Sequence, residues 1–156
     1  MAVTATDLKL YKSQNNTGGA ITATEATGSN VFGVISGADT AAGGTFSALV
    51  YLKNDAAQTA FNMEVWVDSE TSHPGVNAKI ALATEGLNTT VTGTADIKDD
   101  PGVTTVEADG QANALTIGDM AAGAYIGVWV ELTVQAGTAP KDLYSITIGR
   151  GGETGE

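Results

Sequence analysis

The sequence predicts an all-β protein, an antiparallel β-sandwich of the immunoglobulin-like or jelly-roll-like kind with about eight or nine strands. Two segments alternate apolar and polar residues almost without exception, from Phe61 to Asp68 and from Ala124 to Val134. Successive side chains of a strand point to opposite faces of a sheet, so this period of two indicates strands with one buried face. The 20 glycines, with abundant Thr and Val, are typical of short strands joined by turns.

The first half of the chain is expected to contain four strands. They cover Asp7–Lys12, Val31–Ser36, Thr45–Lys53 and Phe61–Asp68, each with apolar residues on one face. The stretch from Asn15 to Gly19 has the composition of a turn, and Gly37 to Gly44 is predicted to be a loop of small residues.

The second half begins with a turn that contains His73 and Pro74. Its expected strands are Asn77–Thr84, Ala124–Val134 and Tyr144–Ile148, with weaker candidates at Val103–Ala108 and Asn113–Ile117 and a tight turn at Gly118–Gly123. No apolar residue follows Ile148. We therefore expect one β-sandwich domain over residues 1–148 and a flexible, Gly-rich C-terminal tail over residues 149–156.

Composition argues against several classes of function. The formal charge is −11, from 7 basic and 18 acidic residues, so the chain has too few cations to neutralise nucleic-acid phosphates directly. No apolar run approaches the roughly 20 residues that a membrane-spanning helix requires. The first residues lack the basic and apolar regions of a secretory signal, and cysteine is absent. Together these features predict synthesis in a reducing cytoplasm, without nucleic-acid or membrane partners.

The sequence predicts no catalytic residue, no cofactor and no metal. His73 is the only histidine, and no nucleophile motif accompanies it, so we interpret it as an exposed turn residue. Asp96, Asp99, Asp100 and Asp109 offer the oxygen ligands that calcium prefers, but their spacing fits neither the EF-hand loop nor a nonapeptide repeat. Whether the Asp96–Asp109 loop binds calcium is left open.

The two tryptophans are the candidate interface. Trp66 and Trp129 fall on the polar side of their strands, and Tyr125 and Glu64 share those sides, with a hollow expected at Gly127. If the two strands were neighbours, the rings would flank each other across the sheet. Tryptophan and tyrosine are enriched at protein interfaces, so these four residues are predicted to contact a subunit or partner. The structural alternatives are that both faces of the sheet are covered, with a loop of the same chain over the rings, or that the rings are simply partly exposed on a monomer.

A glycan is the second possible ligand of this face. An aromatic ring can stack on a sugar when polar groups nearby supply hydrogen bonds. Asn62, Glu64 and Asp68 lie close to Trp66 in the sequence and offer such groups.

Several segments resemble a group of small virion structural proteins of tailed bacteriophages. The opening DLKLYKS at residues 7–13, with Asn15-Asn16 and Gly18-Gly19-Ala20-Ile21, is similar to the start of that group. The resemblance continues in Val65-Trp66-Val67-Asp68, in Leu115 to Gly123, in Val128-Trp129-Val130 and in Gly137-Thr138-Ala139-Pro140-Lys141. Residues 85–109 match nothing in the pattern. The resembling elements mark a fold rather than a chemical site.

The resemblance implies a head decoration or cement protein, with a tail or fibre role as a further possibility. Such a protein would be made in the host cytoplasm and act on the capsid exterior of the virion. Its implied partners are the major capsid protein and copies of itself, with a trimer as one arrangement. The alternative function is an adhesion or glycan-binding module of a tail or head fibre.

Overall fold

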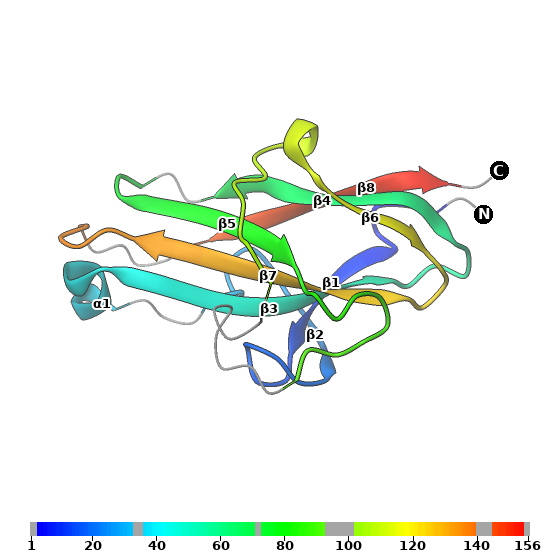
Figure 1. Cartoon of the computed structure of the whole chain (residues 1–156), viewed down its shortest axis with the longest axis horizontal. Helices are drawn as coiled ribbons and strands as arrows, with labels where there is room; N and C mark the ends of the chain where they lie inside the picture. The colour runs from blue at the N-terminus through cyan, green and yellow to red at the C-terminus, as the bar shows by residue number, and fades with distance from the viewer. Residues whose placement is uncertain (1–2, 33–35, 71–72, 93–101, 140–144, 155–156) are drawn as a thin grey trace.

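The computed structural model describes residues 3–32, 36–70, 73–92, 102–139 and 145–154. Within these residues, the strands form two antiparallel sheets, which confirms the predicted all-β sandwich class (Figure 1). The large sheet has the order β2 (Ile21–Glu25), β1 (Leu8–Ser13), β3 (Gly44–Asn54), β7 (Tyr125–Val134) and β5 (Val76–Leu82). The small sheet has the order β6 (Leu115–Met120), β4 (Ala60–Glu70) and β8 (Ile146–Thr154).

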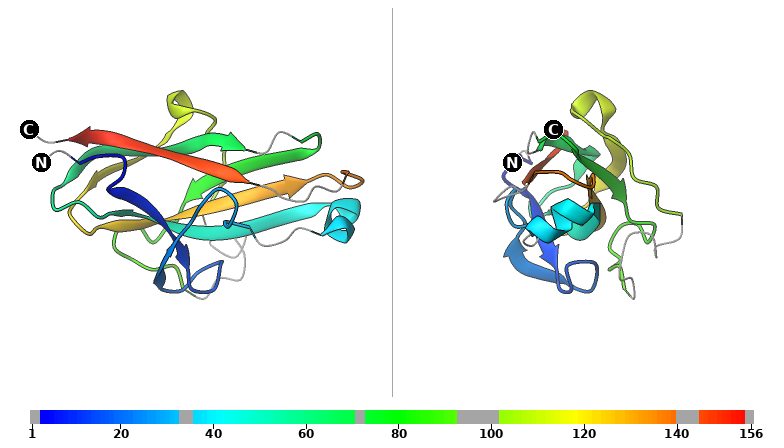
Figure 2. Two further views of the ribbon diagram at one scale, coloured as in Figure 1. Left: turned by 180° about the vertical axis from the view of Figure 1, so that it is seen from behind. Right: turned by 90° about the vertical axis from the view of Figure 1, so that its left-hand side faces the viewer.

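The main core lies between the two sheets and is built from the aliphatic rows that the alternation predicted. From β7 it receives Ile126, Val128, Val130, Leu132 and Val134, and from β4 Met63, Val65 and Val67. The longest pairing joins β3 to β7 in unbroken register, from Gly44 opposite Val134 to Lys53 opposite Tyr125. The right-hand view of Figure 2 looks along the long axis of the molecule, with the short helix α1 (Gly37–Ala42) at the near end.

A second, smaller core lies on the opposite, outer face of the large sheet. It consists of Leu49, Tyr51, Ala81, Ala83, Val91 and Trp129. The segment of residues 83–92, here called the covering loop, leaves the end of β5 and crosses this face (Figure 1). The hollow expected at Gly127 is present and filled, because a Cβ there would lie 2.9 Å from Ala83 Cβ and 3.2 Å from Val91 Cγ2.

The Tyr51 hydroxyl joins the covering loop to the turn before β2. It donates a hydrogen bond to Gly19 O at 2.6 Å and accepts one from Val91 N at 3.0 Å. Gly19 N also donates to Val91 O at 2.7 Å. Tyr51 is fully buried, and burial raises the pKa of its phenol. Both segments are therefore fastened to β3 through one buried oxygen.

One side of the sandwich is closed by a short extended segment. Val106 forms an antiparallel bridge with Ile80 of β5, and Asp109 forms a parallel bridge with Val67 of β4. The segment therefore spans from the edge of the large sheet to the small one, and it covers part of the edge of β5.

The C-terminal segment differs from the sequence-based prediction. Residues 149–154 are not a flexible tail, because β8 runs from Ile146 to Thr154 and pairs with β4 along its length. Ile146 and Ile148 are buried as predicted. The prediction failed here because the glycines after Ile148 carry no apolar side chains that could show alternation. A strand can still form, since its hydrogen bonds come from the backbone.

Four further elements differ from the prediction. Residues 37–42 form α1 instead of a loop, because Ser36 and Asp39 make a capping box that satisfies the first backbone N–H groups. Val31 and Phe32 enter the core from a bend rather than a strand, and residues 33–35 lie outside the described part. β6 continues to Met120, where a turn was expected, and β2 was not predicted.

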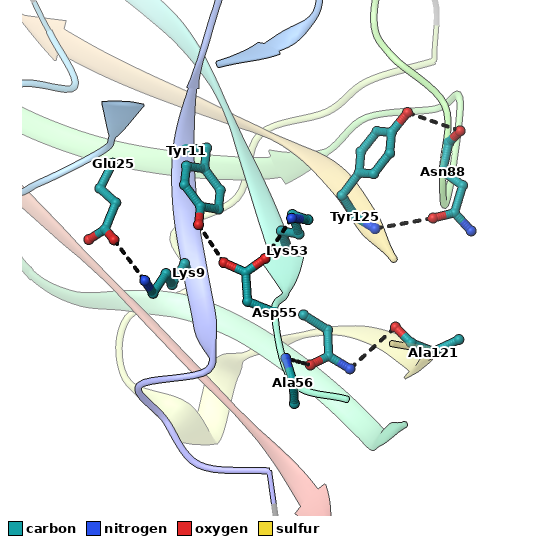
Figure 3. A network of polar contacts seen from close by, with 10 residues as sticks. Lys9, Tyr11, Glu25, Lys53, Asp55, Ala56, Asn88, Ala121 and Tyr125 are labelled. Carbon is teal, nitrogen blue, oxygen red and sulfur yellow. Dashed lines mark hydrogen bonds and ion pairs between the residues drawn. The ribbon is translucent and has the colours of Figure 1, made fainter. Parts of the chain in front are cut away.

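Replacing Tyr51 by Phe should lower the free energy of unfolding by about 1–3 kcal/mol, because the buried Val91 N–H loses its acceptor. The matched control is Tyr11→Phe, which removes a hydroxyl that donates to Asp55 at the exposed surface (Figure 3). We expect that control to cost less than about 1 kcal/mol. Urea unfolding measures both, and equal losses would contradict the role given to Tyr51.

Candidate functional site

The two tryptophans lie in different sheets. Trp129 is on β7 of the large sheet and Trp66 is on β4 of the small sheet. The possibility that their rings flank each other on one surface is therefore wrong. Alternation shows that each ring faces away from its own aliphatic row, but it does not show which strands are neighbours.

Trp129 and Tyr125 are used inside the molecule. Trp129 has 0% of its surface exposed beneath the covering loop. Tyr125 is half-buried, its ring meets that of Tyr51 edge-on at 5.7 Å, and Asn88 of the covering loop holds it (Figure 3). Asn88 Oδ1 accepts from Tyr125 N at 3.2 Å, and Asn88 O accepts from the Tyr125 hydroxyl at 3.2 Å. Trp129 therefore offers no surface to a partner, in contrast to the sequence-based prediction, whereas Tyr125 keeps part of its surface exposed beside the covering loop.

Trp66 remains half-exposed and lies flat along β8. Gly149 is its partner across the ladder, and a Cβ at Gly149 would lie 2.1 Å from the indole Nε1. A Cβ at Gly151 would lie 3.3 Å from the far end of the ring. One face of the indole therefore rests on bare backbone, where a side chain on either glycine would have stood. The ring becomes a fixed platform on the small sheet.

Polar groups surround this platform. Glu64 lies between Thr116 of β6 and Gly151 of β8 in one cross-strand row. Asp68 Oδ1 accepts a long hydrogen bond of 3.4 Å from Trp66 Nε1. We call the outer surface of β6, β4 and β8 the small-sheet face. Its side chains include Phe61, Asn62, Glu64, Trp66, Asp68, Ser69, Thr116, Asp119, Thr147 and Glu153. The amide of Gln111 also approaches this face, because a Cβ at Gly151 would lie 4.0 Å from Gln111 Nε2.

A bulge in β4 organises the end of the small-sheet face near Phe61. Asn62 adopts the left-handed conformation with φ 49°, which asparagine tolerates better than most residues. Its backbone N–H donates to Asp119 Oδ1 at 3.0 Å, and its side-chain amide donates to Glu153 Oε2 at 2.8 Å. One residue therefore holds two carboxylates from the flanking strands, and neighbouring Phe61 is 37% exposed.

Charge is divided between the two sheets. The lysines of the described residues, Lys9, Lys12, Lys53 and Lys79, all belong to strands of the large sheet. Two of them form ion pairs there, Lys9 with Glu25 at 3.1 Å and Lys53 with Asp55 at 2.6 Å (Figure 3). Arg150 of β8 turns inward and donates from Nε to Leu8 O at 2.7 Å. The small-sheet face therefore carries carboxylates without a cation beside them among the described residues.

His73 lines a shallow depression rather than a deep pocket. The depression has a volume of about 400 Å³ and is lined by His73, Pro74, Gly75 and residues 135–139. His73 Nδ1 is 3.0 Å from Pro74 O. The described lining contains no carboxylate, and its one hydroxyl, on Thr138, donates to Gln135 O. These groups do not converge on a reacting atom.

The acidic residues give no metal site in the described part of the chain. Asp96, Asp99 and Asp100 lie outside the described residues, and no group of three or more His, Cys, Asp or Glu side chains suited to a metal occurs within them. Glu70 has its pKa raised by burial, with nearby Asp109 and Glu107 adding to the rise. Its Oε2 accepts from Ala78 N at 2.7 Å, which ties β4 to β5.

Gly149 and Gly151 are the site residues that sequence reasoning missed. They were assigned to a tail because glycine carries no hydrophobic signal. A detectable sign was their spacing, since Thr147, Gly149 and Gly151 continue the outward positions of the strand that begins at Ile146. Cross-strand pairing of an aromatic ring with glycine is a recognised way of filling such positions.

Gly149→Ala should displace the Trp66 ring and lower the free energy of unfolding by about 1–3 kcal/mol, because the new Cβ overlaps the indole. Gly151→Ala is the matched control, with an ordinary backbone conformation and a milder contact. We expect it to be nearly neutral, since alanine also restricts the unfolded chain by about 0.4–1 kcal/mol. Chemical unfolding and acrylamide quenching of tryptophan emission measure both effects. Equal behaviour of the two variants would show that the ring does not rest on Gly149.

Comparisons of the chain with protein-family models, with curated proteins and with solved structures find no match. Among the described residues, no helix has the length and apolar character needed to cross a bilayer.

Proposed function

We propose that this protein is a structural component of a tailed-phage virion, a decoration or cement protein that binds the assembled head. What supports the proposal is the set of resembling segments and their place in the fold. The opening segment forms β1 and the turn into β2, Val65 to Asp68 lies in β4, and Val128 to Val130 lies in β7. The resemblance therefore concerns the strands that define the scaffold.

The single observation that carries the proposal is a rigid sandwich with one exposed aromatic face and no convergent reactive groups among the described residues. A cement protein acts by binding an assembled lattice in preference to free subunits, which favours the assembled state by mass action. Binding at many equivalent positions adds the advantage of high effective concentration. Neither effect requires catalysis, so we infer a non-enzymatic role on the capsid exterior. The major capsid protein is the proposed partner, and self-association, for example as a trimer, is compatible with it.

Purified protein mixed with undecorated mature heads should bind at a fixed ratio and raise the temperature at which the heads release DNA. Saturation at about 100 times the dissociation constant corresponds to about 2.7 kcal/mol per site. Sedimentation of the heads and a dye-release melt measure binding and stabilisation. Association with purified tails, but not with heads, would contradict the decoration role.

The second candidate is a glycan-binding module, favoured by the flat indole of Trp66 with Glu64 and Asp68 beside it and Asn62 further along β4. A sugar ring can stack on the open face of an indole while amide and carboxylate groups bind its hydroxyls. On a glycan array, this function predicts saccharide binding that Trp66→Ala abolishes. A silent array, with head binding present, would eliminate it.

A further inference from the structure

We propose that the small-sheet face is a docking surface for a basic protein surface, and that Trp66 receives an arginine or lysine side chain from that partner. The inference deepens the proposed function, and rests on it in that an assembled capsid would present the basic surface. Three features of this chain support the contact: the position of the Trp66 ring, the distribution of charge between the two sheets, and the covering loop on the outer face of the large sheet.

The Trp66 ring is suited to receive a cation. Its inner face rests on Gly149 and Gly151, so the ring is held in place without a bulky neighbour beneath it. Cations bind over the face of an indole because the ring quadrupole is negative there. Glu64 and Asp68 flank Trp66 on the same side of β4, and Asp68 contacts the indole Nε1. A guanidinium over the ring would have a carboxylate within reach on either side.

The surrounding charge selects the sign of the partner. Asp119 and Glu153, both held by Asn62, extend the negative surface beyond Glu64 and Asp68. None of these four carboxylates forms an ion pair within the described part of the chain. Complementary potentials across an interface favour correct partners, and like charges oppose wrong ones. The same face of a second copy is therefore disfavoured, as are nucleic acids. A neutral sugar could form hydrogen bonds with the carboxylates but would gain no net charge attraction from them.

Part of the outer face of the large sheet is already covered by the chain itself. The outer face of the large sheet uses Leu49, Tyr51 and Trp129 to hold the covering loop. On the small-sheet face, Phe61 and Trp66 remain accessible, and Phe61 lies opposite Glu153. Accessible aromatic side chains among charged groups are typical of a protein contact surface.

A titration with a hexa-arginine peptide tests the chemistry without any capsid. Because Trp129 is buried and Trp66 is half-exposed, acrylamide selectively reports on Trp66. We expect hexa-arginine to protect Trp66 from acrylamide quenching in a saturable way. This protection should weaken as the salt concentration is raised and should be absent with hexa-glutamate. Glu64→Gln combined with Asp68→Asn should weaken binding by tenfold or more, whereas Glu25→Gln on the large sheet should weaken it less than twofold. No protection of Trp66, or equal losses in both sets of variants, would overturn the inference.

Head binding separates this inference from the proposed function. If heads bind the wild-type protein but bind Trp66→Ala and the Glu64→Gln, Asp68→Asn variant equally well, the docking face is wrong and decoration stands. If hexa-arginine binds as expected but heads do not, decoration is wrong and the basic-partner chemistry stands. Loss of both interactions in the variants supports the two proposals together.

Since Trp66→Ala can perturb folding, the blue-shifted emission of buried Trp129 serves as its fold check, and the carboxylate variant retains the ring. Saccharide binding that requires Trp66, without a hexa-arginine response, would assign the face to glycans.

Discussion

The central strands β3 and β7 are apolar on both faces at the end near Tyr125, and the rest of the structure follows from that constraint. On the inner side, the small sheet covers them. On the outer side, Leu49, Tyr51 and Trp129 need a second cover, and the covering loop supplies it from the same chain. Burial of these large side chains is favourable by about 1.5–3 kcal/mol each, so the loop is part of the folded core. The Tyr51 hydroxyl then satisfies backbone groups that the loop would otherwise leave unpaired in the interior.

Strand alternation was sufficient to predict the class of the fold. Val65 and Val67 repeat every second residue, as do Val128 and Val130, so each pair lies on one face of its strand and faces the main core. The same pattern was insufficient for the site. It placed Trp66 and Trp129 on polar sides without distinguishing an open face from one covered by a distant loop. Leu49 and Tyr51, apolar on the nominally polar side of β3, were the available sign that this face is covered. The role of Gly149 was missed for a related reason. The space beside this glycine is filled by the side chain of Trp66 on the neighbouring strand, and the sequence does not show that the two residues are neighbours.

The two faces of the sandwich therefore have different uses. The large sheet holds Tyr51 and Trp129 beneath its own loop, and it balances part of its charge in local ion pairs. The small sheet keeps an indole and several carboxylates at the surface, with a bulge at Asn62 fixing their positions. Surface residues held by backbone geometry lose little conformational entropy on binding, which suits a scaffold whose proposed task is to present a surface.

The segregation of the described lysines onto one sheet gives the described part of the molecule an electric polarity as well as a chemical one. Fields between exposed charges decay over about 8 Å in physiological salt, which is comparable to the thickness of about three water layers at an approaching surface. Near a positively charged boundary, the torque on such a dipole turns the carboxylate-bearing side forward before any atoms touch. A larger share of encounters then has the productive orientation, so the association rate would be high even if each individual contact were weak.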